Sequence, residues 1–519
     1  MYILEFLAAK AVQKRREERK KMLTMKKLAR SILTLLLCLA LLCSASAVAF
    51  AGEGDFSVSR LSVSVNGNAA AQRGFCWYTK SETSSVVKIF KNGIDVSASL
   101  AFSEPVCKEW KGSYMHKVTV SGLESGTEYT YTVGNDSVRS EAGSFRTDDG
   151  DSRLSFIAIA DVQSSSRENF EVGAAVLKKA LEQNENADFV ANLGDFTNDS
   201  TNEEWNLYDE VFAPLNRNYT IAPVAGNHDG LGVWHWFDNM FNLDTCESVQ
   251  TLNGVNYSFD YGNAHFSVLN TNDLLSLSLS QLEWLKNDLA STDRDWKIVF
   301  MHKSPYSLGK DGKWPDALYL QQSLSKVLDE GNADIVFSGH DHMYLRTKKL
   351  TANSLNENGT TYVLSGTAGA KRYQIRPFLA DSFLRTEFID ALCVQKDGYA
   401  NYWNGTDWNS TRKENIGGCF NNISIDGGIL TLDSYILADE KDENGNDVVT
   451  KIDSLTLEKE PGLNTPAFDG ENKTGGLDYA VKAVPSFLKL AYYSVVQWLP
   501  TFLKALPEIL MSYFKDGTF

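Results

Sequence analysis

Residues 154–163 have the sequence LSFIAIADVQ, a continuous apolar run that ends in a carboxylate and an amide. Uninterrupted hydrophobic runs of this length are typical of buried strands that are covered on both faces. Four further runs have the same character and are followed by polar residues: Asp188–Leu193, Ala222–Val224, Trp296–Met301 and Asp334–Ser338. We therefore expect a sheet whose strands place reactive side chains in the loops at their carboxyl ends.

Helical periodicity lies between these predicted strands. Apolar residues recur at helical spacing in Phe170–Leu181, Gln281–Leu289 and Leu318–Leu328. Two additional strands, Tyr257–Tyr261 and His265–Thr271, are separated by a Gly-Asn turn, which predicts a hairpin. The alternation of strands and helices predicts a layered α/β domain over residues 152–459.

Residues 55–148 follow a different pattern of many short alternating strands. Leu61–Val65 and Val118–Val120 alternate polar and apolar residues, which is typical of an antiparallel β-sandwich. The run Gly122–Val133 resembles the tyrosine-corner region of fibronectin type III domains. The expected fold class is thus α+β/α/β, an N-terminal antiparallel β-sandwich followed by a layered α/β-sandwich domain.

The N-terminus carries the features of an export signal. Met25–Arg30 is basic, Ser31–Leu42 is apolar, and Ala49–Ala51 has the small residues that a signal peptidase requires. The apolar run is shorter than the ~20 residues that span a bilayer. We interpret residues 1–51 as an N-terminal extension and signal peptide, and we expect the protein to be secreted or displayed at the cell surface.

Three other segments fall outside the regular pattern. Residues 371–418 are rich in Trp and Tyr and are interpreted as an ordered insertion, whereas residues 460–476 have the composition of a linker. The segment 477–519 is apolar but broken by prolines into short helices. Its part 477–514 either packs on the catalytic domain or lies on a membrane or wall surface.

The charge balance excludes some partners. The chain has 50 Lys and Arg against 66 Asp and Glu; without residues 1–51, which hold ten basic and three acidic residues, 40 face 63, a net charge of −23. Such a surface repels nucleic acid backbones, so nucleic acid is a poor partner, although a local basic pocket could still hold a small phosphate. Five cysteines remain beyond residue 51, and the disulfide pairs considered are Cys393–Cys419 and Cys76–Cys107.

Polar motifs follow each of the five predicted buried strands. In chain order they are D-x-Q, GD-x-x-N, GNHD, a single His and GHDH; their prominent residues are Asp161, Gln163, Asp195, Asn198, Asn227, His228, Asp229, His302, His340 and His342. Asp, Asn and His together suit divalent or trivalent ions such as Zn, Mn and Fe. Because one Asp can bridge two ions, the series predicts a centre of two metals.

The ordered series resembles the signature of the calcineurin-like metallophosphoesterase superfamily. The sandwich ahead of the catalytic domain is similar to the arrangement of purple acid phosphatases, and the resemblance covers residues ~55–459. It implies that Asp161, Asp195 and His342 hold one ion. It also implies that Asp195, as a bridge, holds the second ion together with Asn227, His302 and His340.

The same resemblance implies a phosphoric ester hydrolase that acts on a small phosphorylated substrate and uses a metal-bridging hydroxide as the nucleophile. His228 would donate a proton to the leaving group, and Asp229 would either orient His228 or serve as a turn residue. Two positions depart from the family pattern. Gln163 stands where the superfamily usually has His, and Asn198 stands where purple acid phosphatases have a tyrosine.

These departures leave the fourth ligand of the first ion open. Gln163 could coordinate through its amide oxygen or only orient a water. Without a tyrosinate, a divalent pair of Zn, Mn or Fe(II) is favoured over ferric iron. Two alternatives to an acid phosphatase-like enzyme stay open, namely a phosphodiesterase or 5′-nucleotidase with the same core, and a surface binding protein whose site has degenerated.

Overall fold

The computed structural model describes residues 57–460 apart from short gaps at 230–235, 247–255, 273–279, 310, 313–314, 374–385, 397–398, 404–407 and 411–416. The predictions for residues 1–51 and for the segments beyond residue 460 therefore lie outside the described residues. Within the described part, no helix combines the length and apolar character needed to cross a bilayer.

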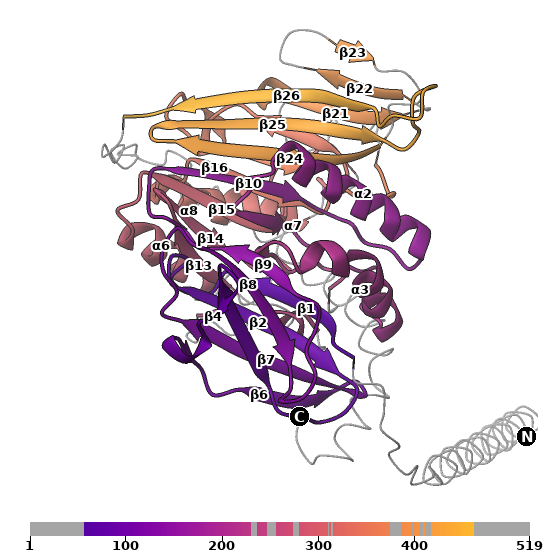
Figure 1. Ribbon diagram of the computed structural model, residues 1–519. Helices are drawn as coiled ribbons and strands as arrows, with labels where there is room; N and C mark the ends of the chain where they lie inside the picture. The colour runs from indigo at the N-terminus through magenta and orange to yellow at the C-terminus, as the bar shows by residue number, and fades with distance from the viewer. Residues whose placement is uncertain are drawn as a thin grey trace, which may run out of the picture. The chain divides into compact units, whose positions relative to one another are not determined.

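The first large sheet runs in the order β26-β25-β24-β10-β11-β12-β1-β2-β7-β5, with β6 also paired to β7 (Figure 1). The bounds of its strands are β1 Ser59–Ser64, β2 Gln72–Thr79, β5 Ala101–Phe102, β6 Val106–Trp110, β7 Ser113–Ser121, β10 Arg153–Ile159, β11 Phe189–Asn192, β12 Ile221–Pro223, β24 Gly417–Asp426, β25 Ile429–Ala438 and β26 Val449–Glu458. The strands β10, β11 and β12 are parallel, as their apolar runs predict.

The second large sheet has the order β13-β14-β15-β16-β20-β17-β21-β22-β23. Its strands are β13 Tyr257–Tyr261, β14 Ala264–Val268, β15 Trp296–Lys303, β16 Ile335–Gly339, β17 Tyr344–Thr347, β20 Thr361–Ser365, β21 Ile389–Lys396, β22 Tyr399–Trp403 and β23 Trp408–Ser410; a small hairpin joins β18 Leu350–Thr351 to β19 Ser354–Leu355. Strands β14, β15, β16 and β20 are parallel neighbours.

The main core lies between these two sheets. Successive residues of a strand point to opposite faces, so β10 contributes side chains to the hydrophobic clusters on both faces of its sheet. Phe156 packs on Phe266, Phe300 and Phe337 of the second sheet, with ring centroids 5.5–6.0 Å apart. The next residue, Ile157, belongs instead to the cluster on the outer face of the first sheet. This alternation confirms the predicted layered α/β-sandwich.

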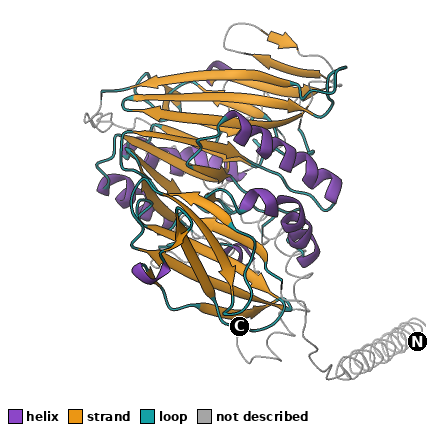
Figure 2. Cartoon of the chain, in the orientation of Figure 1, coloured by secondary structure: helices purple, strands orange, loops and turns teal. Residues whose placement is uncertain are grey.

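Helices cover the outer faces. On the first sheet lie α2 (Arg167–Gln183) and α3 (Asn202–Asn216), which contact each other (Figure 2). The second sheet is covered by α6 (Leu282–Ser291), α7 (Pro315–Tyr319), a π-helical turn (Leu320–Leu324) and α8 (Ser325–Glu330). The remaining short helices are α4 (Trp236–Met240) and the 3₁₀ turns Ser97–Ser99 and Thr386–Phe388. The predicted helix Leu318–Leu328 is thus built from three consecutive helical segments.

The N-terminal region is the predicted sandwich. Its second sheet has the order β4-β3-β8-β9, with bounds β3 Val86–Lys91, β4 Ile94–Asp95, β8 Glu128–Gly134 and β9 Gly143–Arg146. Trp77 is buried in the core of the sandwich and stacks on His116. The hydroxyl of Tyr129 accepts a hydrogen bond of 2.9 Å from the backbone N–H of Glu124, the kind of contact a tyrosine corner makes.

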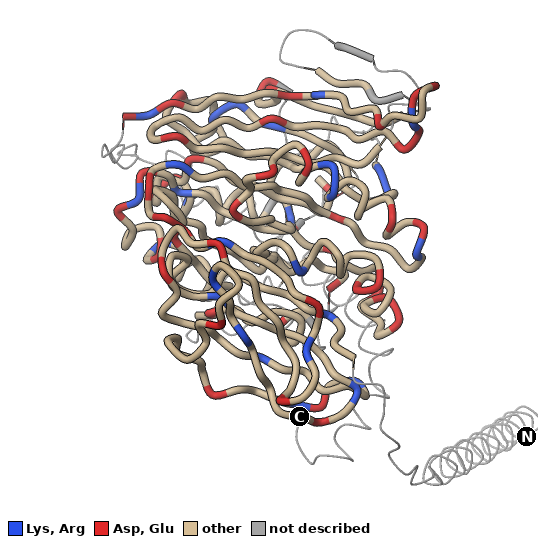
Figure 3. Tube along the Cα trace, viewed as in Figure 1, with Lys and Arg blue, Asp and Glu red and all other residues tan. Residues whose placement is uncertain are grey.

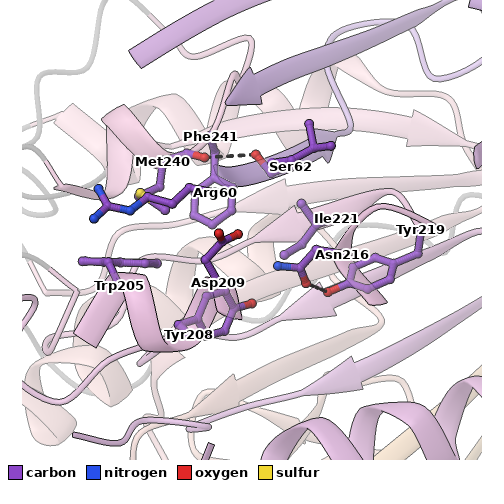
Figure 4. Close-up of a pocket in the computed structure, with 11 residues that line it drawn as sticks. Arg60, Ser62, Trp205, Tyr208, Asp209, Asn216, Tyr219, Ile221, Met240 and Phe241 are labelled. Carbon is purple, nitrogen blue, oxygen red and sulfur yellow. Dashed lines mark hydrogen bonds between the residues drawn. The ribbon is translucent and has the colours of Figure 1, made fainter. Parts of the chain in front are cut away.

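The sandwich and the α/β core share one continuous sheet. Strand β1 pairs in parallel with β12, and the backbone N–H of Val65 donates to Ile221 at 3.1 Å. Beside this pairing, a cavity of about 20 Å³ lies between β1 and α3 (Figure 4). Arg60 lines it and donates to Asn202 and Asn206 of α3. A space of this size holds about one water molecule and is too small for a phosphate ester.

One sequence-based expectation, that of disulfide bonds, is wrong here. The five cysteines of the described chain are free thiols. Cys76 and Cys107 lie on the two strands that flank β7, two strand spacings or roughly 10 Å apart, which is too far for a disulfide. Within the segment 371–418, which was interpreted as an ordered insertion, strand β21 pairs with β17 and extends the second sheet.

Candidate metal centre

The candidate ligands sit on sharp turns at the carboxyl ends of strands. Asp161 follows β10 and Asp195 follows β11, and both have backbone φ angles in the left-handed region, 56° and 58°. His340, directly after β16, has φ of 76°. Few residues other than glycine adopt this region, and such conformations concentrate at functional sites. The turns redirect each side chain from its own strand toward a common point.

Glycine permits the close approach of the second and third motifs. A Cβ at Gly226 would lie 2.1 Å from the backbone nitrogen of Asp195 and 2.2 Å from its Oδ1. These distances are shorter than any van der Waals contact, so a side chain at residue 226 would displace Asp195. The glycine of the GNHD motif is therefore required by packing between two loops.

The first ligand group consists of Asp161, Asp195 and His342. One donor atom from each lies within 4.8 Å of the others, and all three residues are buried. The Nδ1 of His342 donates to the backbone carbonyl of Lys371 at 2.6 Å, so its Nε2 carries the lone pair. Both carboxylate oxygens of Asp161 accept from the backbone N–H of His340 at 3.0 Å. This group contains the residues predicted for the first ion.

The second ligand group consists of Asp195, His302 and His340. The Nδ1 of His302 contacts the carbonyl oxygen of Leu193 at 2.8 Å, which fixes the proton on Nδ1. Its Nε2 lies 3.2 Å from Oδ2 of Asp195 and 3.0 Å from Oδ1 of Asn227. Asp195 belongs to both groups, as the bridging role requires.

The chemistry of these donor atoms fits a pair of cations. The Nε2 atom of His302 lies at hydrogen-bond distance from two acceptor oxygens, one of Asp195 and one of Asn227. Such acceptors repel unless a proton or a cation lies between them. Carboxylate oxygens, an amide oxygen and imidazole nitrogens are ligands that Zn, Mn and Fe(II) accept. Coordination by these residues stays a prediction.

The pKa values of the buried ligand residues are shifted by burial and by the charges of their neighbours. Burial opposes the charged form of His302, but the attraction of Asp195 outweighs burial and raises the pKa of His302 to about 9. Burial raises the pKa of Asp161 well above its usual range. For His340, burial and the repulsion of His302 lower the pKa well below its usual range, which keeps a lone pair available for an ion.

Gln163 reaches the first ligand group with the nitrogen end of its amide. Its Nε2 lies 3.1 Å from Oδ2 of Asp195 and 3.1 Å from Nε2 of His342, while its Oε1 accepts from Lys371 at 3.2 Å. An amide N–H has no lone pair for a metal. In this arrangement the amide nitrogen of Gln163 faces two candidate ligands, and the choice between coordination and the orientation of a water stays a prediction.

The predicted role of Asn198 as a ligand is not supported. Its side chain donates to Asp199 at 3.0 Å, and its backbone carbonyl accepts a hydrogen bond from Nδ1 of His228. The main chain of Asn198 therefore orients His228.

Asp229 does not contact the imidazole of His228. Its buried carboxylate accepts hydrogen bonds from four backbone N–H groups, at 2.7–3.3 Å, those of Asp195, Phe196, Thr197 and Gly226. The prediction that Asp229 orients His228 through its side chain is therefore corrected: Asp229 ties the second and third motif loops together.

Sequence reasoning missed a sixth strand end. After β20, residues 366–369 pass so close to the first motif that a Cβ at Gly369 would lie 2.6 Å from the carbonyl oxygen of Asp161. Tyr373 then stacks on His342, with ring centroids 4.2 Å apart and an interplanar angle of 7°. The apolar run TYVLS followed by GTAG was the signal available in the sequence.

Comparisons with known proteins agree with this geometry. The family model described as calcineurin-like phosphoesterase matches residues 154–344, and that of the purple acid phosphatase N-terminal domain matches residues 58–147. Purple acid phosphatase 23 of Arabidopsis thaliana is 24% identical over 334 residues, 56% of this chain and 70% of the relative. Purple acid phosphatase 22 of the same plant is 23% identical over 310 residues, 57% and 69% of the two chains.

A solved structure titled "Structure of PhoD" shares the fold. It superposes with a TM-score of 0.51 at 12% identity, covering 77% of this chain and 90% of the other. The calcineurin-like match contains all five motifs, and the other match falls on the β-sandwich. Residues 154–344 thus form a domain that matches the calcineurin-like phosphoesterases, residues 58–147 match the N-terminal domain of the purple acid phosphatases, and the comparisons together support a phosphoric ester hydrolase.

Proposed function

We propose that this chain is an exported, acid phosphatase-like hydrolase that cleaves phosphate esters at a centre of two divalent cations. The observation that carries the proposal is the sharing of Asp195 by two ligand groups. One carboxylate common to both groups is what holds two ions close enough to act on a single phosphate. A divalent pair of Zn, Mn or Fe(II) fits the donor set.

The two cations, when bound, would supply an activated water and positive charge for the phosphoryl oxygens. The chain's own residues fix the geometry around them. The backbone N–H of His228 donates to Oδ1 of Asp195 at 2.8 Å, which ties the proton donor to the shared ligand. Because Nδ1 of His228 donates to Asn198, Nε2 is the atom that delivers a proton to the leaving alkoxide.

No tyrosinate supports ferric iron among the described residues of the site. The ring of Tyr373 stacks on the face of His342, with ring centroids 4.2 Å apart, and the second motif has Asn198 where a tyrosine would be expected. This arrangement favours a colourless divalent centre over the purple ferric one. An absorption spectrum of the purified protein tests the point, since a visible charge-transfer band would contradict it.

The proposal is tested by metal content and turnover together. Residues 52–519 are purified, elemental metal is measured, and hydrolysis of an aryl phosphate monoester is compared with that of an aryl diester. About two equivalents of metal are expected in the wild type, and loss of both metal and activity in Asp195→Asn. The matched control is Asp199→Asn, an exposed acid on the same loop, which should retain both.

Each remaining outcome has a defined meaning. A preference for the diester would make the chain a phosphodiesterase or nucleotidase with the same core. A protein that contains no metal and gains no activity with added Zn, Mn or Fe(II) would contradict the proposed function and favour a surface binding protein.

Export and surface attachment are separate parts of the proposal, and both depend on segments outside the described residues. N-terminal sequencing of the secreted protein should find a start near Gly52. Deletion of residues 477–519 tests contact with a membrane or wall. An unchanged partition between membrane and soluble fractions would show that this segment is no anchor.

A further inference from the structure

The segment that follows β20, residues 366–373, runs along the first ligand group. Its sequence is GTAGAKRY, and none of its residues belongs to either ligand group. We refer to it as the post-β20 segment. Asp161 and His342 are the residues that belong to the first group alone, since Asp195 is shared. The post-β20 segment contacts both of them, Asp161 near its start and His342 near its end.

The buried hydroxyl of Thr367 holds the main chain of Asp161. It donates a hydrogen bond of 2.8 Å to the carbonyl oxygen of Asp161 and accepts one of 3.1 Å from the backbone N–H of Gly369. The backbone N–H of Ala368 donates to the carbonyl of Ala160 at 2.8 Å. Asp161 has a left-handed φ of 56°, a conformation that persists where the surrounding contacts hold it. Thr367 therefore fixes the backbone from which the carboxylate of Asp161 extends.

The end of the post-β20 segment makes three contacts with His342. The carbonyl of Lys371 accepts from Nδ1 of His342 at 2.6 Å, and the backbone N–H of Tyr373 donates to the carbonyl of His342 at 3.0 Å. The ring of Tyr373 stacks on the imidazole with an interplanar angle of 7°. The hydrogen bond at Nδ1 sets the tautomer, and the stacked ring sets the plane of the imidazole. Together they determine where the lone pair of Nε2 points.

The second ligand group is held by other loops. The Nδ1 of His302 contacts the carbonyl oxygen of Leu193, which directly follows β11, at 2.8 Å. The Nε2 of His302 lies 3.0 Å from Oδ1 of Asn227, in the loop after β12. The contacts that orient the two groups thus come from different parts of the chain, so one group can be disturbed without the other.

We propose that the post-β20 segment controls the affinity of the first metal position alone, with Thr367 as the positioning residue of Asp161 and Tyr373 as the positioning residue of His342. The inference rests on the proposed centre of two cations and assigns one of its positions to a segment outside the five motifs. Residues that orient metal ligands act through ligand geometry, so their removal weakens binding without removing a donor atom.

Variants that retain a single metal position test the proposal. His342→Ala removes a ligand of the first position and Asn227→Ala removes a ligand of the second, so each background should hold about one ion. Tyr373→Leu added to Asn227→Ala should lower the affinity for Mn(II) about 10–100-fold, measured by chelator competition. Tyr373→Leu added to His342→Ala should change it by less than about twofold, which also shows that the variant folds.

The other end of the post-β20 segment is tested in the same two backgrounds. Thr367→Val removes the hydroxyl at nearly constant volume and should likewise weaken Mn(II) binding in Asn227→Ala only. Thr367→Ser and Tyr373→Phe are the conservative controls, since they keep the hydroxyl and the stacked ring respectively. Both should bind Mn(II) as their background does. Full binding in Tyr373→Phe would also separate positioning by the ring from coordination by the tyrosine oxygen.

Weak binding of cations at the surface must be subtracted. Asp and Glu occur on loops and strands along much of the described chain (Figure 3), and carboxylate oxygens attract Mn(II). Asp195→Asn lacks the ligand shared by both groups and therefore reports this background. Ions that it retains after gel filtration are deducted from the values of all other variants.

The outcomes separate this inference from the proposed function. If Tyr373→Leu and Thr367→Val weaken Mn(II) binding equally in both backgrounds, their effect is on the fold as a whole and the inference is overturned. Unchanged affinity in both backgrounds would overturn it as well, because the ligands would then keep their geometry without these contacts. If the wild type binds no more Mn(II) than Asp195→Asn, the proposed two-cation centre itself fails.

Discussion

The carboxylate of Asp229 accepts a hydrogen bond of 2.8 Å from the backbone N–H of Asp195. The same carboxylate holds Phe196, Thr197 and Gly226 by their main-chain N–H groups. Asp229 therefore links two loops that both carry candidate ligands. It acts on the position of the shared ligand without reaching the substrate.

We predict that Asp229→Asn lowers metal affinity about 10–100-fold, the range typical of outer-shell substitutions at metal sites. The substituted amide brings N–H donors to a place where four N–H groups need acceptors. Chelator competition measures the affinity, with Asp199→Asn as the matched control. Equal metal affinity in the two variants would show that the loops hold their positions without Asp229.

Gly226→Ala should abolish metal binding at both positions. The new Cβ would lie within 2.2 Å of two atoms of Asp195, so the ligand shared by both groups must move. Elemental analysis after purification measures the loss. The control is Gly173→Ala in α2, where the added Cβ would meet neighbours only at 3.3 Å. Full metal content in Gly226→Ala would contradict the predicted bridging position.

His228→Gln should retain metal but slow hydrolysis according to the leaving group. A proton donor contributes about 10²–10⁴-fold when the leaving alkoxide is strongly basic and much less when it is a stabilised phenolate. The comparison is between an alkyl phosphate and a nitrophenyl phosphate, each assayed with wild type and variant. A uniform loss on both esters would assign His228 to binding rather than to proton donation.

A cluster away from the metal centre predicts a pH-dependent stability. Burial lowers the pKa of His265, but hydrogen bonds to Asp260 (2.7 Å) and Asp288 (2.9 Å) outweigh it and raise the pKa to about 9. Arg294, which faces the same cluster, contacts Asp260 at 3.2 Å. Because the pKa is higher in the folded chain, the stabilisation is complete below about pH 6.5 and is lost as the pH rises through 9.

The measurement is denaturant unfolding of the wild type and His265→Gln between pH 6 and pH 10. The difference in unfolding free energy between them should shrink by roughly 2–3 kcal/mol over that interval. Both proteins share every other titrating group, so the difference isolates His265. A difference that does not vary with pH would show that the pKa of His265 is the same in the folded and unfolded chain.

The buried strands were predicted within one or two residues because their apolar runs are unbroken. The run Leu154–Ala160, for example, is realised as β10, Arg153–Ile159. Helix α3 was missed, although its start carries a capping box in which Thr201 and Glu204 bond each other's backbone. Pro214 inside the helix and the mixed polarity of its sequence obscured the apolar stripe.

The candidate ligands were predictable because each follows a strand whose end the sequence marks. The hydrogen-bond partners of Gln163 and Asp229 could not be predicted. Asp229 binds backbone groups, and Gln163 contacts Lys371, which lies 208 positions away in the sequence. Main-chain hydrogen bonds do not depend on residue type, so the hydrogen bond from His228 to the carbonyl of Asn198 could not be predicted from the sequence either. Contacts of this kind need the fold before they can be assigned.

Because β1 pairs in parallel with β12, one continuous sheet joins the β-sandwich to the α/β domain. Removal of the first 148 residues would leave β12 without its neighbour β1. The backbone of β12, the strand that leads into the GNHD motif, would then be unpaired on that side. Bare strand edges recruit other chains. A catalytic fragment without the sandwich is therefore expected to aggregate.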